Sequence, residues 1–494
     1  MNTPAARDWP HRASELGQLL PTGFVMGAAA SAFQIEGASR DGGRSESIWD
    51  VFSARRGRIR DGSNASVAAD HLARYREDVQ LLRDLGADAY SFSLSWSRLQ
   101  PDARGSLNRT GLAFYDQLLD ALLAAGIRPR VTLAHWDLPA ALRGGWMNRD
   151  TAGRFGDYAH AVGAALADRV DSWVTLHEPA TVAVNGYAVG THAPGHSLLF
   201  EALPAVHHQL LGHGLAVQGL RAADVRAPIG IVNAHSPVES ASDRDEDRSY
   251  ADLVDLLYNH AFSDPVLLGH YPAPLEPFGV ELRPLLEADP ADLRTIHQPL
   301  DFYGVSYAQP TRIKAGQSPA TKAALAAARA AAEAGEPAPV AAPGDWPRLP
   351  FHCEQLRERP QTGAGAAIAP DAVAETLARL QGRYGTALPP IYLQVGAGFA
   401  DPVPVRGAVP DPVRIDYLAE HMLAALGAVA PNGAAAGVDL RGVFVRSLLD
   451  GFEWDAGYSE RYGLVHVAFA DSARVGTRTP KQSFRWLQNV LAQR

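Results

Sequence analysis

Residues 24–38 read FVMGAAASAFQIEGA, a short apolar run that passes directly into polar residues. Seven further runs rich in apolar, β-branched and aromatic residues follow, and longer segments with helical spacing separate them. The eight runs are residues 24–29, 89–96, 128–134, 172–176, 228–233, 300–305, 390–395 and 442–448. Strands that alternate with helices predict a parallel sheet, and eight of them predict a closed (β/α)8 barrel of the α/β class, the TIM barrel.

The segments between these runs predict the outer layer and the domain plan. Residues 69–85 and 108–125 carry apolar residues at helical spacing, so we expect amphipathic helices on the outside of the barrel. A single barrel domain is predicted over residues 21–494, after an N-terminal extension at 1–20. An Ala/Pro-rich insertion at about 318–345 precedes the seventh strand. It is either a solvated insertion or a lid, since loops at the C-terminal ends of barrel strands build active sites.

Composition excludes several classes of partner. The formal net charge of -9 provides no basic field for nucleic acid or an anionic membrane surface. No stretch of about 18 apolar residues appears, and the first 25 residues lack the pattern of a signal peptide. The only cysteine, Cys353, permits no internal disulfide. We therefore expect a cytoplasmic protein with a small-molecule or carbohydrate ligand; the sequence leaves its oligomeric state open.

Four strings, in this order, resemble glycoside hydrolase family 1, the family of the β-glucosidases. They are FVMGAAASAFQIEGA at 24–38, TLAHWDLP at 132–139, TLHEPA at 175–180 and SLLDGFEWDAGYSERYGLV at 447–465. The resemblance runs from about residue 20 to the C-terminus and implies a barrel with its site at the C-terminal ends of the strands. It implies no organic cofactor, and no metal site is expected.

The resemblance also implies which residues bind the terminal sugar and which transfer protons. Gln34, His135, Glu453 and Trp454 match the sugar-binding positions, and Glu178 in TLHEPA matches the acid/base glutamate. Taken singly, Gln34, His135 and Trp454 favour ordinary structural roles: a surface amide, a core histidine hydrogen-bonded to backbone and a packing aromatic. Together they favour a ligand site, to which we add Tyr307 and Arg446 as further candidates for substrate binding.

One expected residue is missing. Retaining glycoside hydrolysis needs two carboxyl groups about 5 Å apart, one of which attacks the anomeric carbon. Where the family has a string like IYITENG, this chain reads IYLQVGA, which places Val395 at the nucleophile. The arginine and tyrosine that support the nucleophile in the family are replaced by Ser91 and Ala308. A valine cannot form a glycosyl ester, so we predict that the covalent retaining mechanism is lost.

Arg446 stands where the family has a tryptophan near the eighth strand. Loss of a glutamate and gain of an arginine make the inner site more positive. One hypothesis is that the site accepts an anionic group, such as a carboxylate or phosphate. The alternative is that Arg446 only pairs with Asp450 or Glu453.

The residues that remain predict acid/base chemistry through Glu178, with His177 as a possible base. Such help is worth about two to four powers of ten, which suits activated acetals, eliminations, dehydrations or cyclisations, as in natural-product tailoring. Asp401 is a candidate base for an inverting hydrolysis. A second hypothesis is a sugar-binding protein without turnover. A third is an ordinary β-glucosidase whose nucleophile is not recognised.

Overall fold

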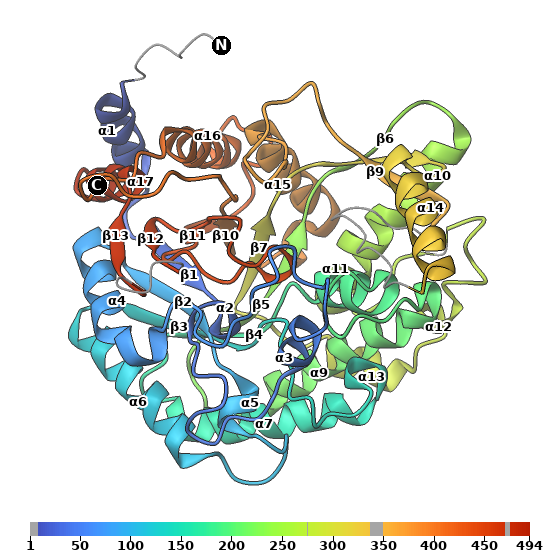
Figure 1. Cartoon of the computed structure of the whole chain (residues 1–494), viewed down its shortest axis with the longest axis horizontal. Coiled ribbons are helices and arrows are strands. Elements are labelled where there is room, and N and C mark those ends of the chain that lie inside the picture. Colours follow the sequence, from blue (N-terminus) through green and yellow to red (C-terminus); the bar gives the residue numbers. More distant parts are fainter. Residues whose placement is uncertain (1–7, 274, 336–348, 470–474) are drawn as a thin grey trace.

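The computed structural model describes residues 8–273, 275–335, 349–469 and 475–494. Eight parallel strands close into a barrel in the order β1-β11-β10-β7-β5-β4-β3-β2, which confirms the predicted TIM barrel and single domain (Figure 1). The barrel strands are β1 Val25–Ala30, β2 Ala89–Ser93, β3 Arg128–Ala134, β4 Ser172–His177, β5 Ile229–His235, β7 Phe302–Tyr307, β10 Ile391–Val395 and β11 Leu440–Arg446. Each lies within two residues of its predicted run at its N-terminal end, because apolar β-branched runs form the buried strands.

Helices surround the barrel, and two small sheets lie outside it (Figure 1). The longer helices are α1 Trp9–Leu19, α4 His71–Leu85, α6 Arg109–Ala124, α7 Asp150–Leu166, α9 Leu203–Ala222, α10 Asp245–Asp255, α11 Ala261–Leu267, α13 Pro290–Ile296, α14 Pro319–Glu333, α15 Pro370–Tyr384, α16 Pro412–Val429 and α17 Gln482–Leu491. Shorter ones are α2 Ala32–Ile35, α3 Ile48–Ser53, α5 Trp96–Leu99, α8 Pro179–Thr181 and α12 Arg283–Leu286. The outer sheets join β6 Val238–Ser240 with β8 Thr311–Ala315 and β9 Phe351–Glu354, and β12 Val465–Val467 with β13 Arg478–Pro480.

The interior of the barrel is filled around one buried arginine. The Arg130 guanidinium lies 3.7 Å from the centre of the Tyr392 ring and 4.7 and 4.5 Å from those of Phe302 and Phe444. Its Nε donates to the Ser172 hydroxyl at 3.0 Å. Burial lowers the pKa of Arg130 to about 10. Because these side chains plug the barrel, ligand chemistry is confined to its C-terminal mouth.

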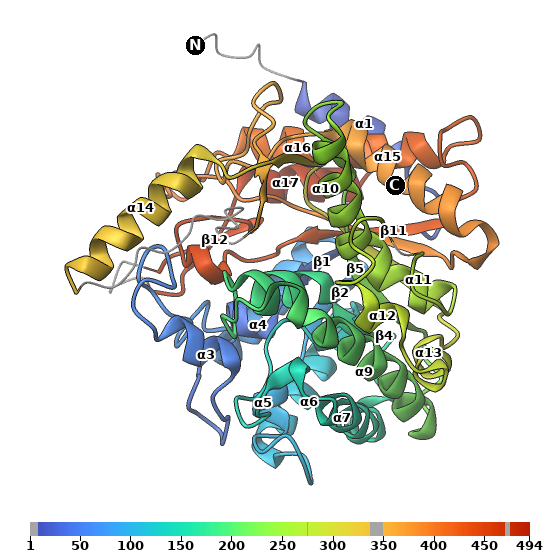
Figure 2. The same ribbon diagram turned by 90° about the vertical axis from the view of Figure 1, so that its right-hand side faces the viewer.

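The predicted N-terminal extension and the predicted insertion at about 318–345 differ in structure. Helix α1 packs on α17 so closely that a Cβ at Gly17 would lie 2.6 Å from the Val490 carbonyl oxygen. Figure 2 shows α14 projecting from the body of the protein. The predicted insertion is helical over Pro319–Glu333, whereas its part at 336–345 and the first seven residues lie outside the described residues. None of the described helices is long and apolar enough to cross a membrane.

A buried histidine behind β4 predicts how stability depends on pH. His213 of α9 has no exposed surface, and its Nδ1 shares a hydrogen bond of 2.6 Å with the Thr175 hydroxyl. Burial lowers the pKa of His213 to about 3. Between pH 6.5 and 3 the unfolded chain therefore binds a proton that the folded chain does not. We expect this residue to remove up to about 1.4 kcal/mol of stability per pH unit as the pH falls through that window.

Urea unfolding at pH 7, 6, 5 and 4 measures this loss. His213→Asn should unfold with a shallower dependence on pH than the native chain, whereas His160→Asn, at an exposed position, should leave the dependence unchanged. Equal slopes for His213→Asn and the native chain would show that His213 does not contribute.

Candidate active site

Side chains from opposite walls of the barrel meet at its mouth. Strands β4 and β11 are four positions apart in either direction around the closed barrel, so their ends face each other across it. Glu178 follows β4, and Arg446 ends β11. The short helix α2 after β1 adds Gln34 to this mouth, and the loop after β11 adds Glu453. A ligand held here lies between a carboxyl group on one side and a guanidinium on the other.

Glu178 is held in one position by two hydroxyl donors. Ser306, inside the end of β7, donates to its Oε1 at 2.5 Å, and Thr181 donates to its Oε2 at 3.2 Å. The residue is only 6% exposed. Its φ of 49° lies in the left-handed region, a conformation of order 1–3 kcal/mol less favourable for a non-glycine residue. Such strain is typical of functional sites, and here it orients the carboxyl group at the mouth.

His177 lies beside this carboxyl group with one nitrogen free. Its Nε2 lies 3.2 Å from the amide oxygen Oε1 of Gln394, and with this orientation of the amide Nε2 is the protonated nitrogen. Among the described residues Nδ1 has no hydrogen-bond partner, and it lies 4.0 Å from Oε1 of Glu178. The ring stacks on His135 with 3.9 Å between centroids. Burial lowers the pKa of both histidines, so His177 is neutral near pH 7 and Nδ1 carries a lone pair.

The predicted sugar-binding residues form one connected group. Gln34 donates to Oε2 of Glu453 at 2.8 Å and accepts from the Ser31 hydroxyl at 2.8 Å. Burial raises the pKa of Glu453 to about 7. The ring of Trp454 lies 4.5 Å from that of Trp136, in an aromatic wall beside this carboxyl group. The group therefore offers hydrogen-bonding atoms next to an apolar face, the combination that a sugar ring requires.

Arg446 faces Glu453 rather than Asp450. Its Nη2 lies 3.6 Å from Oε2 of Glu453, and its guanidinium lies 4.6 Å from the centre of the Tyr462 ring. Asp450 is occupied by other cations: Lys481 donates to it at 2.7 Å, and Arg461 lies 3.5 Å away. Of the two pairings left open by the sequence, the structure therefore has only the one with Glu453, at a distance too long for a hydrogen bond.

Comparison with known proteins shows the family of this chain. The model of the family "Glycosyl hydrolase family 1" matches residues 16–494. The chain belongs to this family. Beta-glucosidase A of Thermotoga maritima is 35% identical over 475 residues, which are 95% of this chain and 97% of that protein. Thermostable beta-glucosidase B of Thermobispora bispora is 41% identical over 95% of this chain and 90% of its own length.

Solved structures of family 1 relatives match over nearly the whole chain. The psychrophilic beta-glucosidase BglU of Micrococcus antarcticus superposes with a TM-score of 0.84 at 39% identity, covering 97% of this chain and 98% of that one. The virulence factor SghA of Agrobacterium tumefaciens, solved with its substrate analog salicin, gives 0.84 at 34% identity over 100% and 99%. This family 1 member thus has its relatives' fold from end to end.

Two of the three positions predicted to have changed lie on barrel strands, and the third lies just beyond one. Val395 ends β10, pairs with Val445 and has no exposed surface. Ser91 is a partly buried residue within β2, and Ala308 is exposed just beyond β7.

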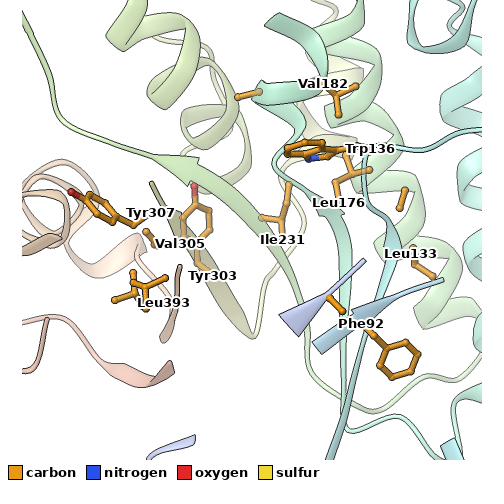
Figure 3. Packing of buried hydrophobic residues seen from close by; sticks show 14 of the residues in the cluster. Phe92, Leu133, Trp136, Leu176, Val182, Ile231, Tyr303, Val305, Tyr307 and Leu393 are labelled. Carbon is orange, nitrogen blue, oxygen red and sulfur yellow. The ribbon is translucent and has the colours of Figure 1, made fainter. Parts of the chain in front are cut away.

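Tyr307 is a correction to the predicted substrate-binding set. Along β7, Ser306 points into the mouth, and Tyr307 therefore points to the opposite side. Its hydroxyl donates to the Ala369 carbonyl oxygen at 2.8 Å. Figure 3 shows it beside Val305 and Leu393 among the buried hydrophobic side chains. Tyr307 is thus a packing residue between the barrel and its outer helices.

Asp401 is a second correction. Arg414 and Lys481 donate to its Oδ2 at 2.7 and 2.5 Å, and its side chain is 3% exposed. Because two buried cations occupy this carboxylate, it is not available as a base.

Sequence reasoning missed Gln394 and Tyr462. Gln394 holds His177, and Tyr462 stacks under Arg446. Gln394 directly precedes the end of β10, and strand alternation could have placed it in the mouth once the barrel was predicted. Tyr462 carried no such signal, since it lies in a loop after β11.

Among the described residues, no group of three or more His, Cys, Asp or Glu side chains is placed to hold a metal ion.

Proposed function

We propose that this family 1 member cleaves a glycoside, or a related small acetal, by acid/base chemistry at Glu178 without a covalent glycosyl intermediate. The observation that carries the proposal is the contrast between two strand ends. Glu178 after β4 is hydrogen-bonded by two hydroxyls, whereas Val395, the residue that the resemblance matches to the nucleophile, is buried at the end of β10. An aliphatic side chain has no electron pair with which to attack the anomeric carbon.

His177 is the partner of Glu178 in this proposal. Glu178 gives its proton to the leaving oxygen as the glycosidic bond breaks. A water attacks the anomeric carbon and gives its proton to Nδ1 of His177. The histidinium then returns that proton to the Glu178 carboxylate, 4.0 Å away, which restores both groups. The neutral state of His177, favoured by burial through its lowered pKa, is the state that this step requires.

The size of this effect limits the substrate. A positioned acid/base pair supplies about two to four powers of ten, so the leaving group must already be a good one. Elimination, dehydration and cyclisation need the same two proton transfers and belong to the same proposal. Tailoring of natural products offers such activated substrates.

Two other functions make different predictions. A sugar-binding protein without turnover would use the Gln34–Glu453 pair and the Trp454 wall, but it would have no need of a free base beside Glu178. An ordinary β-glucosidase, the activity in the names of the relatives, would need another carboxylate as nucleophile. The two enzyme proposals differ in whether a covalent intermediate forms.

Treatment with an activated 2-fluoro glycoside tests this difference. We expect hydrolysis of activated aryl glycosides but no added sugar mass on the intact protein, because no carboxylate attacks the anomeric carbon. A β-glucosidase relative that accumulates the adduct under the same conditions serves as the control. A sugar ester on any carboxylate at the mouth of the barrel would overturn the proposal in favour of the ordinary β-glucosidase, and no turnover of any glycoside would favour the binding protein.

A further inference from the structure

Arg446 is a half-buried cation whose guanidinium donates no hydrogen bond to any residue that the structure describes. Its side chain is 24% exposed, and its contacts among the described residues are the 3.6 Å approach to Glu453 and the face of Tyr462. Arg98 and Arg478, which are also buried, donate to carboxylates at 3.0 and 2.8 Å. A guanidinium has five N–H donors, and leaving them unpaired at a partly desolvated site is unfavourable. The free donors therefore point to a missing acceptor.

Glu453 is not a hydrogen-bond acceptor for Arg446, from which it lies 3.6 Å away. Burial raises its pKa to about 7 against the lowering effect of Arg446, and the nearby carboxylates of Asp450 and Glu460 raise it further. At neutral pH this carboxyl group is thus only partly ionised, and its Oε2 already accepts from Gln34. Arg446 therefore has no hydrogen-bonded anion at the mouth among the described residues.

The position of Arg446 shows which part of a ligand it meets. It ends β11, on the wall opposite Glu178 after β4. A ligand whose scissile bond lies at Glu178 therefore directs the far side of its terminal ring to Arg446. Glu453 lies beside Arg446 and accepts from Gln34, so both side chains would face the same side of the ring.

We infer that Arg446 binds a carboxylate carried by the terminal sugar, so that the substrate class is the glycosides of sugar acids such as hexuronic acids. This inference rests on the proposed function for the placement of the scissile bond at Glu178. The guanidinium donates in parallel from two nitrogens to both carboxylate oxygens, a geometry that this planar group favours. The carboxylate replaces Glu453 as the principal anion beside Arg446.

A carboxylate fits this place better than a phosphate. A phosphate dianion would carry twice the charge next to Glu453, 3.6 Å from the same guanidinium. A second cation to offset that charge is not at hand among the described residues, because His135 and His177 are kept neutral by burial, which lowers their pKa values. Lys481 is already bound to Asp450.

Calorimetric titration with D-glucuronate, D-glucose and D-glucose 6-phosphate tests the inference on the whole chain. We expect D-glucuronate to bind about 10- to 100-fold more tightly than D-glucose, the range for a charged hydrogen-bonded pair. Arg446→Gln should reduce that preference to about one. Arg441→Gln, which removes an exposed arginine from the same strand, should keep it.

Three binding results would overturn the assignment of Arg446 to a sugar carboxylate. Equal affinity of the native chain for D-glucuronate and D-glucose overturns it, as does tighter binding of D-glucose 6-phosphate than of D-glucuronate. A preference that survives in a folded Arg446→Gln variant also overturns it. If Arg446→Gln does not fold, Glu453→Gln gives the second test: removing the competing carboxylate should tighten D-glucuronate binding relative to D-glucose, and an unchanged or weakened preference counts against Arg446.

The inference and the proposed function fail separately. Preferential binding of D-glucuronate without turnover of an activated aryl glucuronide would leave the sugar-acid site standing and remove the catalytic proposal. Turnover that depends on Glu178 but shows no preference between aryl glucuronide and aryl glucoside would do the reverse.

Discussion

Glu178→Gln should lower turnover of an activated aryl glycoside by about 100-fold or more while the fold and ligand binding persist. An amide cannot donate or accept the proton in transit, and general acid/base help of this kind accounts for about two to four powers of ten. Glutamine keeps the size of the side chain; its amide oxygen can accept from one of the two hydroxyls, Ser306 or Thr181, and its amide nitrogen can donate to the other. Initial rates and calorimetric affinity, measured on the same preparation, separate a loss of chemistry from a loss of binding.

Two variants make this result specific. Glu375→Gln changes an exposed glutamate on α15 and should leave the rate unchanged. Ser306→Ala removes the 2.5 Å hydrogen bond to Glu178 and should lower the rate by less than Glu178→Gln, since the carboxyl group remains. Full activity of Glu178→Gln would assign the chemistry to another residue.

Val395→Glu should destabilise the fold by about 3 kcal/mol or more rather than restore a glycosidase. The side chain has no exposed surface, and an unpaired charge in such a place is strongly unfavourable. Val395→Gln introduces a side chain of the same size as glutamate but without its charge, so it measures the cost of size and polarity alone. The difference in free energy of unfolding between the two variants, measured with urea, gives the cost of the charge. That difference should decrease at low pH, where the glutamate carboxyl group is neutral.

The same position predicts a gain of function. If the missing groups act as a unit, Val395→Glu combined with Ser91→Arg and Ala308→Tyr should recover stability relative to Val395→Glu alone. The triple variant should also form a covalent adduct with an activated 2-fluoro glycoside. Efficient labelling of a fully stable Val395→Glu single variant would show that an arginine at 91 and a tyrosine at 308 are unnecessary. The three residues would then not act as a unit.

The site residues that could be predicted are those carried by unbroken local strings at strand ends. Glu178 and His177 lie in TLHEPA directly after a strand, and the barrel itself brings such ends together. Tyr307 was wrongly predicted to bind substrate because side chains alternate along a strand. Its neighbour Ser306 faces the mouth, so Tyr307 faces the packed outer side of the barrel. Asp401 was misplaced for another reason, since nothing local reveals that Lys481, eighty residues away, holds its carboxylate.

The sequence by itself determined the barrel, the presence of Glu178 after one of its strands and that of Val395 at the end of another, because these follow from apolar periodicity and from residue identity at strand ends. Only the tertiary structure decided which charges are paired. Arg446 has Glu453 at 3.6 Å and no closer anion among the described residues, whereas Asp450 belongs to Lys481. Pairing depends on distances between segments far apart in the chain, and on burial that alters both hydration and pKa, so neither charge could be assigned before the chain was folded.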